Sequence, residues 1–234
     1  LLQNEAAREQ TPAMPFDVCG AMSQGMIGYH IQQALGEALK EQGLLQRPVT
    51  LISQVVVDKE DLAFKNPTKP IGPFYDKAQA EDLARETGHT FREDAGRGWR
   101  RVVPSPDPLE IVELAQVKAL MEGGFIPVAA GGGGIPVARD EAGRLYGVDA
   151  VIDKDLAACR LAEDLKADVL LILTEVEQAY LDFGTPEQQG IEHISSEELL
   201  TCQGQGQFAS GSMGPKAEAA FRFVSGHPFR RDRK

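Results

Sequence analysis

The sequence predicts an α/β protein with a mainly parallel sheet that helices cover on both faces. Two segments, Val49–Val57 and Asp168–Leu173, are rich in apolar and β-branched residues and have the length of buried strands. Between such runs, apolar residues recur at helical spacing, as Met26, Ile31 and Leu35 do. Apolar strands that alternate with helices are typical of a parallel sheet enclosed by helix layers.

The order of the elements follows from periodicity and from breaking residues. We expect a first helix over residues 23–40, which Gly43 ends. After residue 108 we expect a helix over 109–122, a strand over 125–130, a glycine loop over 131–134, a hairpin over 144–152, a helix over 155–165, the strand over 168–173 and a last helix over 214–224. Residues 59–108 are rich in proline, glycine and charge, which predicts a small protruding lid because unstructured loops of that length are uncommon.

Composition limits the classes of function. The 234 residues contain 42% hydrophobic residues, enough for one large domain or two small ones. The formal charge of −11 argues against nucleic acid or anionic membranes as general partners, so any nucleotide must bind at a local cationic site. Cys19, Cys159 and Cys202 lie far apart without metal-ligand spacing, which favours reduced thiols. With no signal peptide or spanning apolar run in this sequence, we expect a cytoplasmic protein.

Two lysines lie where a loop leads into an expected helix. Lys154 lies in Val-Ile-Asp-Lys-Asp, residues 151–155, and Lys216 ends Gly-Ser-Met-Gly-Pro-Lys, residues 211–216. The first N–H groups of a helix lack intrahelical partners and the helix dipole is positive there, so phosphate is attracted and an ammonium strengthens the attraction. The pattern indicates a phosphoryl-transfer site, and a kinase is the first hypothesis.

The acidic neighbours of Lys154 have two explanations. Asp153 and Asp155 suit a helix start as capping or first-turn residues, which would make this segment an ordinary surface helix. Alternatively, Asp155 orients neighbouring lysines and keeps them charged, since an opposite charge nearby favours the protonated amine.

Four consecutive glycines, Gly131, Gly132, Gly133 and Gly134, follow the expected strand over 125–130. Lacking Cβ atoms, they would let the backbone approach a small ligand or a phosphate. A flexible turn at a sheet edge is the alternative. The Ile-Pro-Val that follows is extended rather than the start of a helix, so a dinucleotide fingerprint is excluded, and no P-loop sequence is present.

A set of motifs extends over almost the whole chain: Asp17–Tyr29, Asn66–Phe74, Asp94–Pro106, the glycine loop with Ile135–Val137, Val151–Asp155, Ile172–Thr174 and Gly211–Lys216. Together they resemble the carbamate kinases, within the amino-acid-kinase superfold, over roughly residues 14–225. The resemblance implies a three-layer αβα sandwich with a mainly parallel central sheet. It implies a single domain over residues 1–234, with the lid subdomain, residues 59–108, protruding from it.

The resemblance also implies an activity and a site. Carbamate kinases convert ATP and carbamate reversibly into ADP and carbamoyl phosphate with Mg²⁺, usually in the ATP-forming direction in arginine fermentation. Lys154 and Lys216 match the two lysines that neutralise the transferring phosphoryl group, and Asp155 matches the acid that organises them. Lys69 matches the lysine that the lid brings over carbamoyl phosphate, and the glycine loop matches the carbamate side.

The remaining implications concern the nucleotide, the metal and the assembly. The positions at which the family holds ATP or ADP are Thr174, Glu175, Val176, Tyr180, Met213 and Lys216. Mg²⁺ is expected to be held mainly through the nucleotide phosphates, so no residue is assigned as a metal ligand. A homodimer is the expected assembly.

The sequence departs from the family pattern at both ends. The family's Gly-Gly-Asn and His-Gly-Asn-Gly-Pro loops match no part of it, and the family's last strands and helix are replaced by a basic tail, residues 229–234. We therefore expect a chain truncated at both termini, with little activity of its own. Two alternatives stay open: another amino-acid kinase, such as one acting on acetylglutamate, although those lack the Asn66–Phe74 motif; and a non-catalytic remnant that binds nucleotide or a partner subunit through the helix over 23–40.

Overall fold

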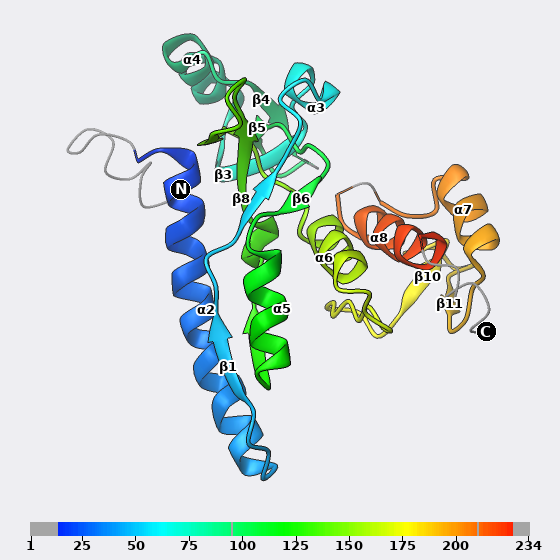
Figure 1. The fold of residues 1–234 in the computed structure, drawn as a ribbon. Helices are drawn as coiled ribbons and strands as arrows, with labels where there is room; N and C mark the ends of the chain where they lie inside the picture. The colour runs from blue at the N-terminus through cyan, green and yellow to red at the C-terminus, as the bar shows by residue number, and fades with distance from the viewer. Residues whose placement is uncertain (1–13, 95, 210, 227–234) are drawn as a thin grey trace. The chain divides into compact units, whose positions relative to one another are not determined.

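The computed structural model of the protein describes residues 14–94, 96–209 and 211–226 (Figure 1). The basic tail singled out in the sequence lies outside these residues. The fold is mixed α/β with parallel strand pairs, which confirms the predicted class. The chain divides into two compact units, Leu1–Lys154 and Asp155–Lys234, and each is described by itself. Among the described residues, no helix has the length and apolar character needed to cross a membrane.

The first unit contains the long helix of the chain and the strands that follow it. Its elements are α2 (Phe16–Glu41), β1 (Arg47–Thr50), β2 (Gln54–Val56), α3 (Leu62–Lys65), β3 (Lys69–Tyr75), α4 (Lys77–Thr87), β4 (Phe91–Glu93), β5 (Trp99–Val103), β6 (Glu110–Ile111), α5 (Leu114–Glu122), β7 (Phe125–Val128), the short 3₁₀ helix η1 (Gly131–Gly133), β8 (Ile135–Arg139) and β9 (Leu145–Gly147).

Two parallel strand pairs form the framework of this unit. β1 pairs with β7, and β2 pairs with β8 in a sheet of order β6-β2-β8-β9 whose outer pairings are antiparallel. The predicted strand over 49–57 is therefore two strands, because Leu51–Ser53 leave one sheet before the chain enters the other. α2 packs against β1, β7 and β8, and α5 packs against β7 (Figure 1).

Two other boundaries in this unit differ from the sequence expectation. The helix expected over 109–122 begins only at Leu114, because Glu110 and Ile111 form strand β6 alongside β2. The hairpin expected over 144–152 lies earlier, between β8 and β9. Its turn is fixed by Asp140, whose carboxylate accepts hydrogen bonds from the backbone N–H groups of Ala142 and Arg144.

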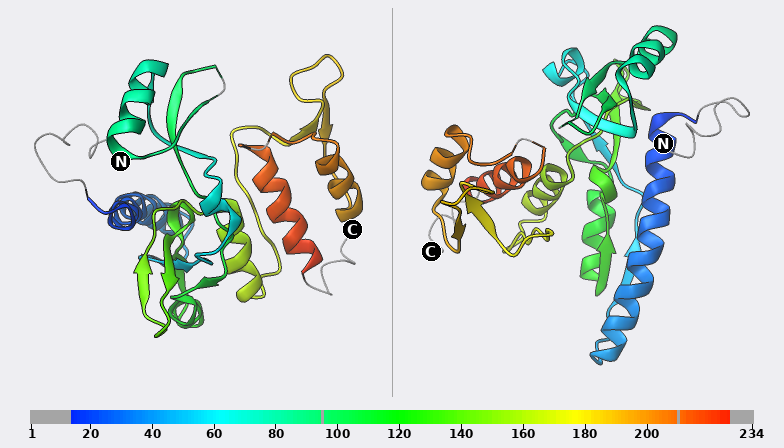
Figure 2. Two further views of the ribbon diagram at one scale, coloured as in Figure 1. Left: turned by 90° about the horizontal axis from the view of Figure 1, so that it is seen from above. Right: turned by 180° about the vertical axis from the view of Figure 1, so that it is seen from behind.

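Residues 62–103 carry a small sheet of their own, of order β3-β5-β4 (Figure 2). Its helix α4 was missed because the segment has few apolar residues. α4 begins instead at a capping box, in which the Asp76 side chain accepts from the Gln79 backbone and the Gln79 side chain accepts in return. Arg97 and Arg100 both stack on the Phe74 ring at 5.0 Å, which stiffens the sheet.

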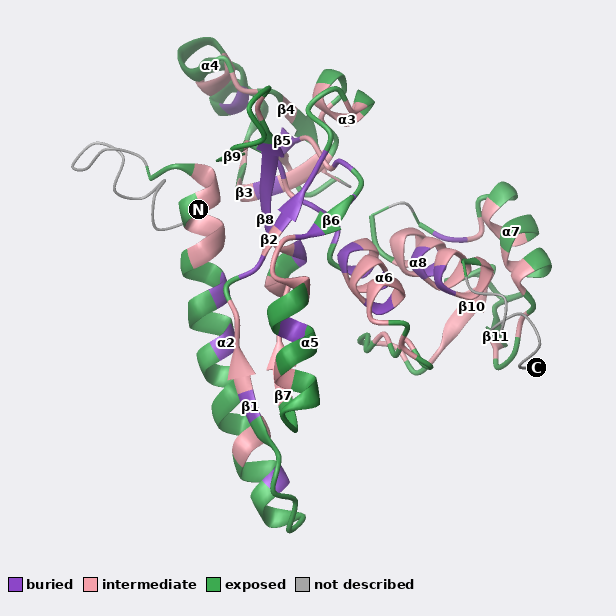
Figure 3. Ribbon diagram, viewed as in Figure 1, coloured by how far each residue is buried: buried purple, intermediate pink, exposed green. Residues whose placement is uncertain are grey.

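The predicted helix over 23–40 is present and begins earlier, at Phe16. Its burial is not what the apolar periodicity indicates. The buried side of α2 includes Gln24 and Gly28, while Met22, Met26 and Tyr29 are 57%, 61% and 58% exposed. Figure 3 shows α2 as exposed over much of its length. α2 therefore presents an apolar surface that the described part of the chain leaves uncovered.

The second unit contains α6 (Lys154–Asp164, whose first residue ends the first unit), β10 (Ala179–Leu181), β11 (Gln189–Ile191), α7 (Ser196–Gly204) and α8 (Met213–Ser225). Its core joins α6 to α8 through Cys159, Ala162, Ala219 and Phe223, with Leu170 and Ile172 packed against them. The small alanine and cysteine side chains allow the two helices to approach closely. Both predicted helices, over 155–165 and 214–224, are present within one residue of their expected bounds.

The strand predicted over residues 168–173 is not a strand in this structure. Leu170 and Ile172 face the core of the second unit, whereas Val169, Leu171 and Leu173 are 71%, 77% and 83% exposed. The side chains alternate as a strand requires, but strand β10 of the same unit pairs with β11 instead. Without a neighbouring strand to form a hydrogen-bonded ladder, an apolar run stays irregular.

Candidate active site

Lys216 and Asp155 form a close, shielded ion pair inside the second unit. Lys216 lies in the first turn of α8, after Pro215, and Asp155 lies in the first turn of α6. The Lys216 ammonium donates to both Asp155 carboxylate oxygens, at 3.0 and 2.9 Å. The side chains are only 14% and 8% exposed. The helix dipole favours the Asp155 carboxylate in the first turn of α6 and disfavours the Lys216 ammonium in the first turn of α8, so the ion pair compensates for the position of Lys216.

Lys69 and Asp153 form a second ion pair, inside the first unit. Lys69 is the first residue of β3, and its ammonium lies 2.9 Å from a carboxylate oxygen of Asp153. The Asp153 side chain is 7% exposed and that of Lys69 is 30% exposed. Lys154, the first residue of α6, lies between the two aspartates in sequence and is exposed. Each aspartate that flanks Lys154 is thus held by a lysine that the sequence singled out.

The glycine loop adopts a backbone that other residues would not tolerate. Gly132, Gly133 and Gly134 have φ of 69°, 107° and 86°. A Cβ on Gly133 would overlap the carbonyl group of Ile152, and one on Gly134 would overlap the Val55 side chain. The loop thus lies against the chain that leads into Lys154, which argues against the alternative of a merely flexible turn.

A buried polar network fixes this loop and was not found from the sequence. The Gln24 amide donates to the Ser53 carbonyl at 3.0 Å and accepts from the Ser53 N–H at 2.8 Å. The Ser53 hydroxyl in turn accepts a hydrogen bond from the N–H of Ala130, at 3.0 Å. The Ser53 backbone carbonyl also accepts one from the N–H of Ile135. A glutamine among the apolar residues of α2 and a serine inside a β-branched run were the available signals.

The residues predicted to hold the nucleotide lie in the second unit. Thr174 and Glu175 are exposed in the segment after residue 173, and Val176 is half-buried. Tyr180 lies in β10 and Met213 begins α8, three residues before Lys216. Both are half-buried. Of the six predicted positions, four therefore lie in β10 and in the irregular segment that precedes it, and Met213 and Lys216 lie in the first turn of α8.

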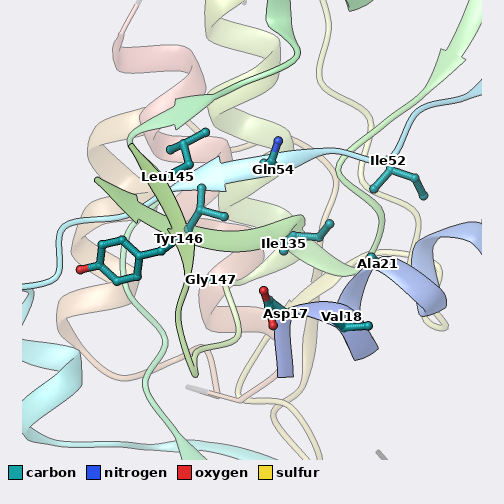
Figure 4. A pocket seen from close by; sticks show the side chains of 10 residues that line it. Asp17, Val18, Ala21, Ile52, Gln54, Ile135, Leu145, Tyr146 and Gly147 are labelled. Atoms are coloured by element: carbon teal, nitrogen blue, oxygen red, sulfur yellow. The ribbon is translucent and has the colours of Figure 1, made fainter. Parts of the chain in front are cut away.

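A pocket of about 330 Å³ lies elsewhere in the first unit, where the start of α2 approaches β2, β8 and β9 (Figure 4). None of the predicted site residues lines it. Its lining residues are Asp17, Val18, Ala21, Ile52, Gln54, Ile135, Val137, Leu145, Tyr146 and Gly147.

The other chemical groups to consider are possible metal ligands and the cysteine thiols. Within residues 14–94, 96–209 and 211–226, no group of three or more histidine, cysteine or acidic residues is placed to hold a metal ion. Burial, together with the nearby Glu163 carboxylate, raises the pKa of the Cys159 thiol to about 11. Because the thiolate is the reactive form, the raised pKa and the 2% exposure of Cys159 both suit a packing role in the core of the second unit.

Comparison with known proteins shows the family to which the chain belongs. The model of the amino acid kinase family matches residues 14–229. The carbamate kinase of Pyrococcus horikoshii is 54% identical over 213 residues, which are 91% of this chain and 68% of that protein. The carbamate kinase of Clostridium perfringens is 53% identical over the same shares. The structure of a carbamate kinase from Giardia lamblia bound to AMP-PNP is similar with a TM-score of 0.86 and 48% identity, over 96% of this chain and 71% of that one.

The chain thus belongs to the amino acid kinase family of phosphotransferases. Within that family it is one of the carbamate kinases, as the identities of 53–54% with curated members show. The resemblance drawn from the motifs is confirmed, and the alternative of another amino-acid kinase falls away. The chain spans about two thirds of the length of these relatives.

Proposed function

We propose that this protein transfers a phosphoryl group between ATP and carbamate through Lys154, Lys216 and Asp155. The observation that carries the proposal is the Lys216–Asp155 ion pair, which joins the opening turns of two helices in a chain 54% identical to a carbamate kinase. The balanced reaction is ATP + carbamate ⇌ ADP + carbamoyl phosphate. The bond broken and the bond formed both join the transferred phosphorus to an oxygen, so no oxidant or further reactant is needed.

The proposed roles follow from the charge that such a transfer develops. A phosphoryl group in flight carries negative charge on its equatorial oxygens and needs in-line positioning more than a protein nucleophile. In the proposal, Lys154 and Lys216 supply positive charge to those oxygens. Asp155 holds Lys216 by both carboxylate oxygens, which fixes the ammonium before substrate arrives. Charge fixed in advance stabilises the transition state without reorganisation.

The proposal places carbamate at the glycine loop, Gly131–Gly134, and places carbamoyl phosphate under Lys69. Support comes from the close contact of Gly133 with the Ile152 carbonyl, by which the loop lies next to the segment that leads to Lys154. The nucleotide is proposed to bind in the second unit, at Thr174, Glu175, Val176, Tyr180, Met213 and Lys216. Half-buried apolar and aromatic side chains such as Tyr180 and Met213 suit a purine base.

Mg²⁺ is proposed to enter with the nucleotide. The carboxylates beside Lys154 do not suit a metal site, because Asp153 and Asp155 are already bonded to lysine ammonium groups. Phosphate oxygens of ATP or ADP would supply the ligands instead, with several waters retained, as Mg²⁺ prefers.

A homodimer in the cytoplasm completes the proposal, with ATP formation in arginine fermentation as the expected direction. The apolar surface of α2, formed by Met22, Met26 and Tyr29, supports self-association because these side chains recur at helical spacing and are more than half exposed. Met26→Glu should convert the dimer into a monomer in size-exclusion chromatography with light scattering. An unchanged mass would place the interface elsewhere.

The two lysines give the direct test of function. In the protein expressed from its complete gene, Lys154→Met and Lys216→Met should each lower kcat by about 10²-fold or more, the scale for removing one preorganised donor of charge. Lys118→Met, which changes an exposed lysine on α5, is the control and should leave kcat unchanged. The assay couples ATP formed from ADP and carbamoyl phosphate to a spectrophotometric signal. Near-normal turnover of both site variants would refute the assignment.

A further inference from the structure

We propose that Asp153 is a positioning residue that holds the Lys69 ammonium for carbamoyl phosphate. The inference rests on the proposed function, in which Lys69 contacts that substrate. The sequence assigned Asp153 no role beyond that of a capping or first-turn residue of the following helix. The observation behind it is the 2.9 Å contact between the Lys69 ammonium and a carboxylate that is 7% exposed.

Backbone contacts bring the two residues together independently of their charges. Lys69 pairs with Val103 in the ladder between β3 and β5. The next residue, Pro104, accepts a hydrogen bond from the N–H of Val151 at 2.9 Å. Asp153 follows two residues later. The small sheet is therefore tied at its base to the chain that leads into α6, and the ion pair lies beside this tie.

The exposures of the two side chains suit positioning more than stability. Asp153 is shielded, so its carboxylate is fixed, while Lys69 keeps 30% of its side chain exposed and can meet a ligand. A lysine has a flexible four-carbon stem and would otherwise sample many rotamers. Removing the Asp153 charge leaves a lysine that is 30% exposed and can be solvated, so the change should cost less stability than breaking the more shielded Lys216–Asp155 pair. Holding one ammonium in place is what this arrangement accomplishes.

A second ion pair between the same two regions provides a matched control. Arg101, in β5, lies 3.6 Å from a carboxylate oxygen of Asp149, whose side chain is 68% exposed. It joins the small sheet to the chain before α6 just as the first pair does, but the distance is longer and the carboxylate is exposed, although the Arg101 side chain is only 16% exposed. A long contact to a solvated carboxylate contributes little. Asp149→Asn should therefore leave the kinetics unchanged.

The test compares substrate affinities in the protein expressed from its complete gene. Asp153→Asn removes the charge and keeps the size, and we expect KM for carbamoyl phosphate to rise about tenfold while Kd for ADP stays within about threefold. Lys69→Ala combined with Asp153→Asn should be no worse than Lys69→Ala alone, because the aspartate acts through the lysine. Additive losses in the double variant would overturn the inference.

Two further outcomes separate positioning from a purely structural role. The midpoint of thermal unfolding of Asp153→Asn should stay within a few degrees of the wild-type value. Equal losses of affinity for carbamoyl phosphate and ADP, together with a large drop in this midpoint, would overturn the inference. If Asp153→Asn does not fold, the same measurement is made on Asp153→Glu. A KM for carbamoyl phosphate equal to that of the wild type would then overturn the inference. Wild-type protein without any turnover would instead refute the proposed function.

Discussion

Replacing Asp155 by asparagine should destabilise the second unit and also reduce activity. The Lys216 ammonium donates to both oxygens of this carboxylate, and the two side chains are 14% and 8% exposed. Removing one partner of a buried pair leaves the other charge uncompensated, which costs about 3–5 kcal/mol. Because Lys216 keeps some contact with solvent, we expect a cost at or slightly below the lower end of that range, about 2–3 kcal/mol, for Asp155→Asn.

The double replacement separates a lost attraction from a stranded charge. Lys216→Met combined with Asp155→Leu removes both charges and keeps apolar bulk, and such replacements are often neutral or stabilising. The double variant should therefore be more stable than Asp155→Asn while remaining without activity. This reversal is the distinctive expectation, because independent losses would instead add.

Hydrogen exchange measured by mass spectrometry gives the local readout that this experiment needs. The single tryptophan, Trp99, lies in the first unit and does not report on the second. Peptides from α6 and α8 should exchange faster in Asp155→Asn, by roughly 30- to 150-fold for 2–3 kcal/mol of lost stability. Peptides from α2 should be unchanged. Exchange in α6 and α8 at the wild-type rate, or a double variant less stable than the single one, would refute the reasoning.

Three further outcomes are expected. Gly133→Ala should lower the free energy of unfolding by about 2–4 kcal/mol, because its Cβ would overlap a backbone carbonyl and its φ is positive. Gly132→Ala has open space around it and should lower the free energy of unfolding by only about 1 kcal/mol. Equal midpoints of the two variants in urea denaturation would contradict this. Gln24→Ala removes the hydrogen-bond partners of the buried Ser53 N–H and C=O groups and should lower the free energy of unfolding by about 2–4 kcal/mol. Gln32→Ala loses one exposed hydrogen bond, to the Thr50 N–H, and should lower it by about 1 kcal/mol. The raised pKa of the Cys159 thiol keeps it protonated in the folded state, so its contribution to stability is present below pH 9 and is lost as the pH rises towards about 11. The stability difference between wild type and Cys159→Ala should therefore shrink over this pH range. A difference that stays constant from pH 8 to 11 would contradict this.

The parts of the candidate site whose local structure was predicted correctly from the sequence are those fixed by neighbouring residues. Lys154 and Lys216 lie at the starts of helices, as the loop-to-helix patterns around them indicate. The glycine loop has positive φ at three consecutive positions, and four glycines in a row are the sequence signal for such a backbone. Backbone requirements of this kind are written into a few neighbouring residues, so no knowledge of tertiary contacts was needed to find them.

The parts that the sequence did not reveal depend on contacts between distant residues. Asp153 was explained as a cap, and its bond to Lys69 spans 84 positions of the chain. Gln24 and Ser53 lie 29 positions apart, and each has an ordinary polar side chain that local patterns do not distinguish. Helix α4 was missed for another reason, since its capping box is local but its apolar residues are few.

The segment 168–173 shows what an apolar pattern establishes and what it leaves open. Alternation is present, since Leu170 and Ile172 pack on the core of the second unit and their neighbours face outward. A strand is defined by a partner, however, because its backbone N–H and C=O groups must find a ladder. The same distinction applies to α2, whose helical spacing is correct although its apolar side chains Met22 and Met26 are exposed. Periodicity therefore predicts the conformation that a segment can adopt, whereas burial and pairing depend on which surfaces of the molecule meet it.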